Sequence, residues 1–311
     1  MSIRNQVLID APGLCGWTES FEDLPHGLQR VFSRARSVDL SGDWPLLDLL
    51  DLSDSPAAAL CALHQQFEPT NRHWLRFDPV QLTPDLTAVW IRSRAELNLS
   101  AESMQPLLSE LSAMFEAAGL NWRLSRCGHY GLIQSSEPFD CRFAALDQCI
   151  GHRLDEVLPQ GRHQSLWRQL MNESQMIFHQ FKSLADGRAD GFGLWFWGAG
   201  KLVPAAPALT GSIVTAESEQ QHSDHWLGLA KHAGLQITAG HGIQAGIGCQ
   251  LVESAMIQSS DQLERLDQAW VQPALKALKT GRLGRLTLVD QCKAWLMRPA
   301  EYWAFWRRRR A

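Results

Sequence analysis

Imidazole and carboxylate side chains with a spacing suited to metal binding occur at His222, Asp224 and His225. Their nitrogen and oxygen atoms are ligands that Zn²⁺ and Mn²⁺ accept. Asp10 follows the apolar run 7–9 and offers a further carboxylate. If the fold brought these four residues together, they would hold Mn²⁺ or Mg²⁺. An apolar pair directly follows His225, and this pattern favours the polar start of a surface helix, so we expect no bound cofactor.

A second group of candidates combines one carboxylate with two tryptophans. On a helix with 100° between residues, Glu173 lies at the edge of the apolar face of 162–182. A carboxylate there either pairs with an arginine or contributes to a site. Trp195 and Trp197 share one side of an expected strand between glycines, where they either fill the core or form the wall of a pocket. We predict that Glu173 and Trp197 line one site.

The glycine-rich segment 240–248 does not have the residue order of a phosphate-binding loop. It contains neither G-x-x-x-x-G-K-[ST] nor G-x-G-x-x-G, and it predicts flexible turns. The chain also has no G-x-S-x-G nucleophile turn, no H-E-x-x-H zinc helix and no EF-hand loop. These common catalytic motifs therefore give no assignment.

Apolar periodicity predicts the elements that must position these residues. Strands are expected at 7–9, 74–80, 86–91, 122–124, 130–133, 194–197, 213–214, 251–257 and 286–289. Helices are expected after residue 25 and at 57–67, 101–118, 162–182, 224–231, 261–278 and 302–310. The alternation predicts an α/β fold with a mixed sheet covered by helices. We expect a single domain of residues 1–311, with 198–211 as a long loop or an internal boundary.

Several of these segments, in order, resemble the RpfE-type regulatory proteins of bacteria, a family described as phosphoglycerate-mutase-like. The resemblance rests on HWLRFDPV (73–80), Leu82, Pro84-Asp85, LPQG (158–161), Trp167, Asn172-Glu173, Gln175-Met176, LWFWG (194–198), Gly281-Arg282-Leu283 and Phe305 to Arg308. It implies a degenerate form of the alkaline-phosphatase and phosphoglycerate-mutase sandwich. It also implies a regulatory protein without mutase activity, because the second aspartate cluster, the nucleophilic serine and the pair of ligating histidines have no counterpart that we identify.

The same resemblance implies a surface that binds a small molecule or a protein partner. Its expected residues are Trp195, Trp197, Glu173, Asn172, His73, Arg76 and Asp78. The rival hypothesis is a metal-dependent phosphoryl-transfer enzyme that uses Asp10, His222, Asp224 and His225.

Composition and charge place the chain among globular proteins. Of 311 residues, 45% are hydrophobic and 20% are charged, and no apolar run approaches the ~20 residues of a membrane span. The start lacks the pattern of a signal peptide, and none of the 7 cysteines forms a C-x-x-C pair, so we expect a cytoplasmic protein.

The end of the chain is basic, although the whole chain has a formal net charge of −4. From Lys276 onward it carries ten Lys and Arg residues against two acids, which leaves an acidic body. That body would repel nucleic acid, which is not expected as a partner. We expect the aromatic residues of 302–306 to dock on the core rather than on a membrane.

Overall fold

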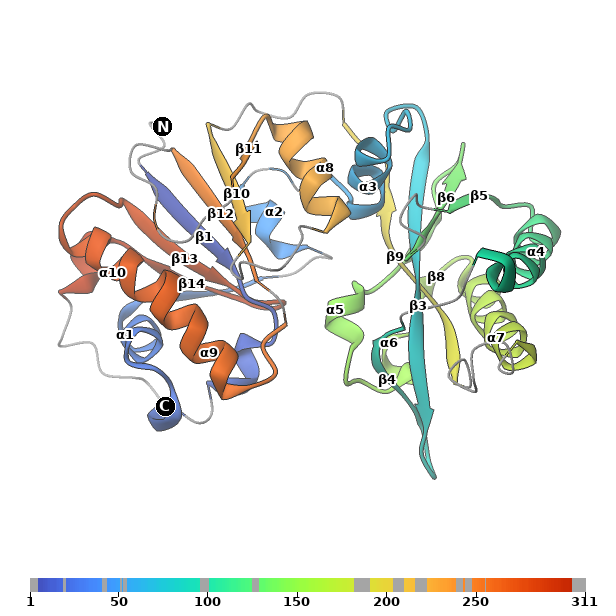
Figure 1. The fold of residues 1–311 in the computed structure, drawn as a ribbon, viewed down its shortest axis with the longest axis horizontal. Coiled ribbons are helices and arrows are strands. Elements are labelled where there is room, and N and C mark those ends of the chain that lie inside the picture. The colour runs from blue at the N-terminus through green and yellow to red at the C-terminus, as the bar shows by residue number, and fades with distance from the viewer. Residues whose placement is uncertain are drawn as a thin grey trace. The chain divides into compact units, whose positions relative to one another are not determined.

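The chain divides into two compact units (Figure 1). Unit 1 comprises Met1–Ser53 and Ala205–Ala311, and unit 2 comprises Asp54–Pro204. The computed structural model describes residues 5–18, 21–40, 44–50, 52, 55–95, 101–124, 129–181, 191–203, 210–215, 223–238, 243, 248–254 and 256–303, without the side chains of 45, 48, 101–103 and 215.

Unit 1 is built on a seven-stranded sheet in the order β11-β10-β12-β1-β13-β14-β2. Its strands are β1 (Gln6–Asp10), β2 (Arg36–Asp39), β10 (Gly211–Thr215), β11 (Gln236–Ile237), β12 (Cys249–Glu253), β13 (Arg285–Val289) and β14 (Lys293–Met297). The first five strands in the sheet order are parallel to one another, β14 is antiparallel to β13, and β2 is antiparallel to β14. The central strands are apolar on both faces, as expected for a parallel sheet covered on both sides.

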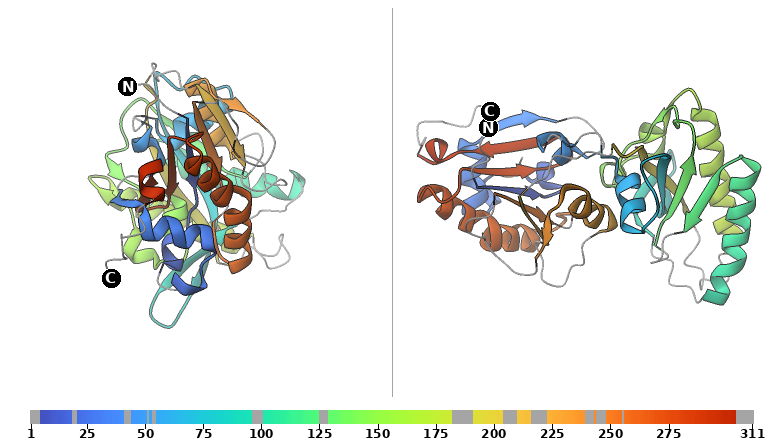
Figure 2. Two further views of the ribbon diagram at one scale, coloured as in Figure 1. Left: turned by 90° about the vertical axis from the view of Figure 1, so that its left-hand side faces the viewer. Right: turned by 90° about the horizontal axis from the view of Figure 1, so that it is seen from above.

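The helical elements of unit 1 include α1 (His26–Arg34), α2 (Pro45–Leu49), α8 (Asp224–Ala233), α9 (Ser260–Leu266), α10 (Gln272–Lys279), α11 (Pro299–Tyr302) and the short turns η1 (Leu14–Trp17) and η2 (Phe21–Asp23). Ile9, Val252 and Leu288 occupy one row of the sheet and share a core with Leu28 of α1 and Leu275 of α10. Figure 2 shows this unit from two further directions.

A π-helix, η3 (Asp267–Val271), separates α9 from α10. The sequence predicts one uninterrupted helix over 261–278, and the structure differs because the chain widens at the buried Asp267. Its Oδ2 accepts hydrogen bonds from Gln272 Nε2 at 2.7 Å and from the amide of Gly27 at 3.3 Å. Packing of α1 against this carboxylate therefore accompanies the change of helix type.

Unit 2 is built on an antiparallel sheet around the long strand β3 (His73–Pro84). This strand pairs with β4 (Val89–Arg94), β6 (Gly131–Ser135) and β9 (Phe192–Gly200), and β6 also pairs with β5 (Asn121–Leu124). A separate short pair joins β7 (Cys141–Arg142) to β8 (Gln160–Gly161). The predicted hairpin of β3 and β4 is confirmed.

Helices cover both faces of the unit 2 sheet. They are α3 (Ala57–His64), α4 (Ala101–Ala117), α5 (Leu146–Cys149), α6 (Leu154–Val157) and α7 (Gln164–Gln180). Phe196 of β9 packs against Phe115 of α4 and Trp167 of α7. Arg76 of β3 points to the opposite face, where its Nη1 lies 3.4 Å from Cys61 Sγ of α3. Four tryptophans of unit 2 are buried in its core, namely Trp74, Trp167, Trp195 and Trp197.

The predicted α/β class, with a mixed sheet covered by helices, is what the structure shows. The single domain of 1–311 stays a prediction, and the chain divides into two compact units. The expected boundary region 198–211 contains the second break, but the first break, after Ser53, has no signal in composition. Each unit has its own sheet and its own hydrophobic core. Among the described residues, no helix is both long enough and apolar enough to cross a membrane.

Candidate functional site at the carboxyl edge of the parallel sheet

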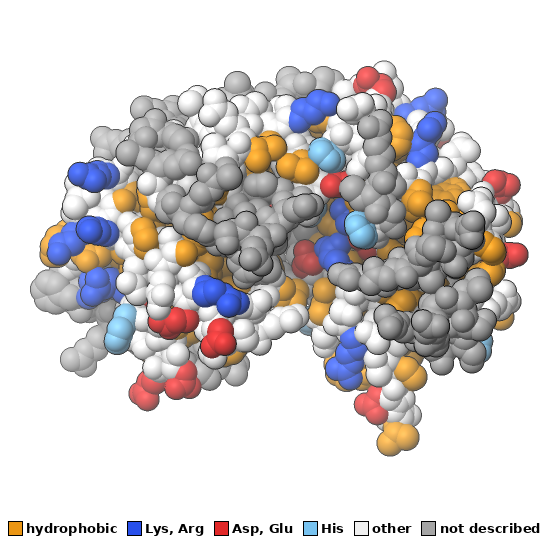
Figure 3. Space-filling view, viewed as in Figure 1, with side chains coloured by type: hydrophobic (Ala, Val, Ile, Leu, Met, Phe, Trp, Pro, Cys, Tyr) orange, Lys and Arg blue, Asp and Glu red, His pale blue; other side chains and the backbone are white. Residues whose placement is uncertain are grey.

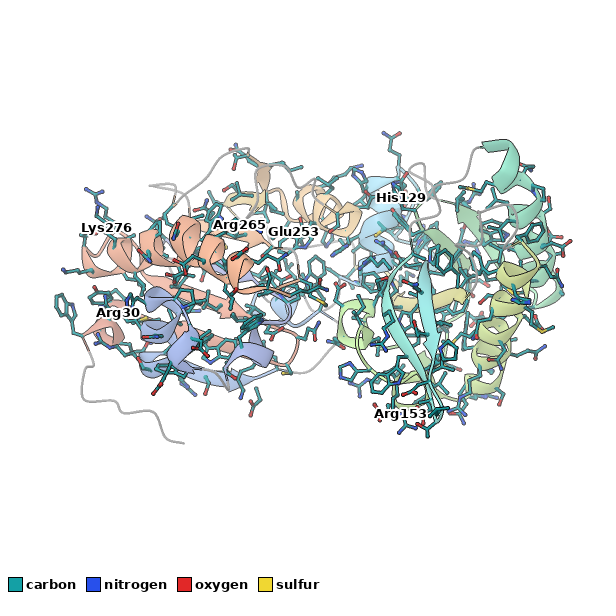
Figure 4. All side chains as sticks on the ribbon, turned by 60° about the horizontal axis from the view of Figure 1, so that its bottom comes forward. Arg30, His129, Arg153, Glu253, Arg265 and Lys276 are labelled. Atoms are coloured by element: carbon teal, nitrogen blue, oxygen red, sulfur yellow. The ribbon has the colours of Figure 1, made fainter. Side chains whose placement is uncertain are left out.

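Acidic residues gather where the parallel strands of unit 1 end. Asp10, the last residue of β1, is the register partner of Glu253 in β12 and of Val289 in β13. Asp290 follows Val289 directly. The connection from β12 to β13 passes over β1, and the carboxyl edge of a sheet at such a crossing is where α/β proteins bind ligands. Figure 4 labels Glu253 at this edge.

Glu253 fixes the beginning of α8. Its Oε1 accepts hydrogen bonds from the Ser223 amide at 3.2 Å and from Ser223 Oγ at 2.6 Å. Ser223 is the residue before the first turn of α8, and its Oγ also lies 3.4 Å from Nε2 of His225. Glu253 is buried, so these bonds replace water around its carboxylate.

Asp290 fixes the loop that follows β1. Its carboxylate accepts hydrogen bonds from the amides of Gly13 at 3.0 Å, Cys15 at 2.5 Å and Gln291 at 2.6 Å. Gly13 has φ +87°, and a Cβ there would lie 2.8 Å from the carbonyl oxygen of Ile257. The loop therefore requires glycine at position 13 and is held to Asp290 by two charge-assisted bonds, from Gly13 and Cys15.

Two cysteines lie together beside this loop. Cys15 Sγ is 3.7 Å from Cys292 Sγ, although 277 positions separate the two residues in the sequence. Burial raises the pKa of the Cys15 thiol well above its ordinary value, and Asp290 and Cys292 raise it further. Cys292 is exposed. No spacing rule predicts this pair, because the parallel arrangement of β1 and β13 creates it.

The predicted metal ligands are brought together only in part. Asp10 and Asp224 are half-buried, and the ring of His225 packs edge-on against Trp44 with centroids 4.7 Å apart. His222 lies outside the described residues. The oxygen donors of Asp10 and Glu253 suit Mn²⁺ or Mg²⁺ in chemical type. Within the part of the chain that the structure describes, however, no three His, Cys, Asp or Glu side chains form a group able to hold a metal ion. The described residues alone therefore do not make a complete site for Mn²⁺ or Mg²⁺.

Three of the predicted ligand-binding residues form one buried network in unit 2. The Asp78 carboxylate accepts bonds from Arg76 Nε at 2.8 Å, Arg76 Nη2 at 2.6 Å and Trp197 Nε1 at 2.6 Å. Arg94 Nη1 adds a bond to Asp78 at 2.9 Å. The Arg76 guanidinium lies over the ring of Tyr130, 3.9 Å from its centroid.

The charges of this network stabilise each other. Burial alone would raise the pKa of the Asp78 carboxyl, but Arg76 and Arg94 outweigh it and hold that pKa below its ordinary value. Burial likewise opposes the charged form of Arg76, and Asp78 outweighs it and raises the pKa of Arg76. Arg76, Asp78 and Trp197 are at most 5% exposed, so their contacts are those of a core.

The remaining predicted residues lie apart from this network. Glu173 is half-buried on α7 and accepts a bond from Gln169 Nε2 at 2.7 Å, one helical turn away, and Asn172 is exposed. Helix α7 covers the Phe196 side of β9, whereas Trp197 points to the other side. The predicted shared site of Glu173 and Trp197 is therefore not what the structure shows, because neighbours along a strand alternate between faces.

Trp195 and His73 have separate surroundings. Trp195 is buried and donates from Nε1 to the carbonyl of Ala144 at 3.0 Å. His73 is half-buried at the start of β3, where its register partner is Ser135 of β6.

Comparison with known proteins gives no family assignment. No family model matches the chain, and no curated protein matches it. A solved structure of a cofactor-independent phosphoglycerate mutase from Thermoplasma acidophilum is 14% identical with a TM-score of 0.43, covering 95% of this chain and 90% of that chain. The PH0037 protein from Pyrococcus horikoshii is 9% identical with a TM-score of 0.44, covering 95% of this chain and 87% of that chain. At these scores the site must be interpreted from its own residues.

Proposed function

We propose that this chain is a ligand-binding protein that takes a small molecule at the carboxyl edge of the unit 1 sheet, without a tightly held divalent cation. The observation that carries the proposal is that the carboxylates at this edge accept hydrogen bonds from the neighbouring loops. Asp290 is bonded by three backbone amides, and Glu253 is bonded by the amide and hydroxyl of Ser223. These carboxylates position the two loops that border the edge, as a binding site requires.

The edge favours a ligand that donates hydrogen bonds. Asp10 is half-buried at the end of β1, and Asp224 is half-buried at the start of α8, next to Ser223, which bonds to Glu253. Ionised carboxylates accept hydrogen bonds and donate none. The ligand class is therefore a small molecule with hydroxyl or ammonium groups. The resemblance to RpfE-type proteins adds a cytoplasmic, regulatory role to this proposal.

One observation favours a second candidate, a metal-dependent phosphoryl-transfer enzyme. Asp10 and Glu253 are neighbours in register, and two adjacent carboxylates attract a cation. When bound, such a cation would polarise a phosphoryl oxygen. In this candidate Asp10 would hold the cation and His225 would lie beside it.

The two candidates differ in a direct assay. Purified protein is analysed for bound metal, and it is then assayed for conversion of 3-phosphoglycerate with added Mn²⁺. The ligand-binding proposal expects neither stoichiometric metal nor turnover. Turnover that is lost in Asp10→Asn, but kept in the exposed control Asp261→Asn, would overturn it in favour of the enzyme.

Ligand binding itself is tested by saturation-transfer NMR with glucosamine, a probe that offers an ammonium group and several hydroxyls. Binding is expected for the wild type and for Asp261→Asn, and is expected to be lost in Asp10→Asn. Equal signals from all three proteins, or none from any of them, would contradict the assignment of the edge to donors of this class.

A further inference from the structure

A cavity of about 400 Å³ opens in unit 2, where β5 and β3 begin and β6 ends. It is lined by Arg72, Arg123, Asn121, Gln134, Ser135 and Ser136, together with Trp122 and the turn 119–120. All of these residues belong to one unit and to the described part of the chain. The volume falls in the range of pockets that take small molecules.

The charge of this cavity has one sign. Arg72 and Arg123 are the charged residues of the lining, and none of the carboxylates in the described part of the chain lines it. Both arginines are exposed and keep their charge at any physiological pH. The ion pairs of Arg76, Arg94 and Arg153 involve neither Arg72 nor Arg123.

Glu68, the acid nearest to Arg72 in the sequence, bonds to Thr70. Glu68 accepts bonds from the amide of Thr70 at 3.3 Å and from its hydroxyl, and these bonds lower the pKa of the Glu68 carboxyl. Arg123 instead lies over the ring of Phe67, with its guanidinium carbon 5.3 Å from the centroid. This contact orients the guanidinium without using its charge on an acid.

The neutral lining groups are also donors. Ser135 Oγ accepts a bond from the Glu137 amide at 3.0 Å, which leaves its proton for another acceptor. Asn121 and Gln134 are register partners across β5 and β6, and each carries an amide NH₂ group. Strand β5 is at the edge of the sheet, so one row of its backbone N–H groups takes no part in strand pairing.

We propose that this cavity binds a phosphorylated small molecule, with the phosphate group held by Arg72 and Arg123. Two guanidinium groups surrounded by hydroxyl and amide donors match the oxygens of a phosphate monoester. Trp122 is a half-buried residue of the lining, and its ring packs against Phe115 with centroids 5.5 Å apart, on the opposite face of β5 from Arg123. This site lies in unit 2 and does not depend on the ligand proposed for unit 1.

The test is isothermal titration calorimetry of the full chain with ribose 5-phosphate at low ionic strength, with ribose as the uncharged probe. Ribose 5-phosphate is expected to bind, ribose is not, and binding is expected to weaken in 0.5 M NaCl because the charges are exposed. Arg72→Gln and Arg123→Gln are each expected to lower the affinity by about tenfold or more.

Matched variants separate a binding role from a structural one. Arg168→Gln removes an exposed arginine of α7 that does not line the cavity, and it is expected to leave the affinity unchanged. Arg123→Lys keeps the charge if Arg123→Gln proves unstable, and it is expected to bind better than Arg123→Gln. Asp10→Asn is expected to have no effect, so failure of the unit 1 proposal would leave this result intact.

Three results with ribose 5-phosphate and ribose would overturn the proposal. They are the absence of heat with millimolar ribose 5-phosphate, equal binding by the folded double variant Arg72→Gln/Arg123→Gln, and equal binding of ribose. Citrate distinguishes a phosphate site from a general anion site, and citrate bound as tightly as ribose 5-phosphate would also contradict it.

Discussion

Replacing Asp78 by asparagine removes the negative charge at the centre of the buried network of unit 2. Asp78 accepts four hydrogen bonds, two of them from Arg76, within 2.6–2.9 Å. The variant keeps the size of the side chain but leaves the Arg76 guanidinium buried without a counter-charge. Breaking a buried pair in this way costs about 3–5 kcal/mol of stability.

The position of each partner sets the size of the effect. For a unit of this size, about 3–5 kcal/mol corresponds to a melting temperature lower by roughly 10 °C. Arg94 also bonds Asp78, but its side chain is 37% exposed, so water screens its charge. Arg94→Met is therefore expected to cost only about 1 kcal/mol. The paired change Arg76→Met with Asp78→Leu removes both charges and is expected to recover much of the loss.

The assay is urea unfolding followed by near-ultraviolet circular dichroism, with the wild type and each variant at pH 7. The low pKa of Asp78 also gives the sign of the pH dependence. Stability from this group is present above its unfolded pKa of about 3.9 and is lost as the pH falls through the lower folded value. An Asp78→Asn variant within about 0.5 kcal/mol of the wild type would refute the reasoning, because a buried unpaired guanidinium cannot cost so little.

Three further predictions concern other charged or reactive groups. Burial raises the pKa of the Asp267 carboxyl, so the stability that this group contributes is lost as the pH rises from its unfolded pKa of about 3.9 through its higher folded pKa. Asp267→Asn should therefore make the melting temperature depend less on pH in this range. An unchanged pH dependence of melting would contradict the assignment. Diamide should oxidise Cys15 and Cys292 to a disulfide, because their sulfur atoms lie 3.7 Å apart, and diamide itself is reduced to the hydrazine. Mass spectrometry should then find the two peptides linked. Two thiols that are still free after this treatment would count against the prediction. Glu173→Gln should change the free energy of unfolding by less than about 0.5 kcal/mol, because Glu173 bonds to Gln169, one turn away on the same helix. Urea unfolding measures this change. A larger loss would show that Glu173 has a structural role.

Elements with a regular apolar period could be predicted from sequence. The strand after residue 6, the β3–β4 hairpin and helices α7 and α8 are found where periodicity places them. Strand β2 was missed because its residues Arg36–Asp39 are polar and partly exposed at the sheet edge. The break after Ser53 was not predicted, because no run of glycine, proline or charged residues marks it in the sequence.

The C-terminal prediction is confirmed in part. Tyr302 is 8% exposed in the core of unit 1, and its hydroxyl accepts a bond from Arg30 Nη1 at 2.9 Å. Trp303 is 55% exposed, so the aromatic residues do not all share one buried face. Phe305, Trp306 and the four arginines lie outside the described residues. Basic side chains also appear at the α10 end of unit 1 (Figure 3), where α10 contributes Lys276 and Lys279.

The candidate site could be predicted only as separate pieces. Asp10 and His225 stood out because a carboxylate after an apolar strand and an imidazole beside acids are recognisable locally. Their connection through Ser223 and Glu253 depends on β12 lying next to β1, a pairing between residues more than 240 positions apart. Burial of individual arginines could not be predicted either. The sequence alone does not tell that Arg76 is buried in a strand and that Arg72 is exposed in a turn.

A titration of Mn²⁺ into metal-free protein, followed by isothermal calorimetry at pH 7, tests the central claim most directly. If Glu253 and Asp290 serve to hold the loops of the carboxyl edge, micromolar Mn²⁺ should produce no saturable heat in the wild type or in Asp10→Asn. Stoichiometric binding by the wild type, abolished in Asp10→Asn and kept in Asp261→Asn, would contradict the account and identify the edge as a metal centre.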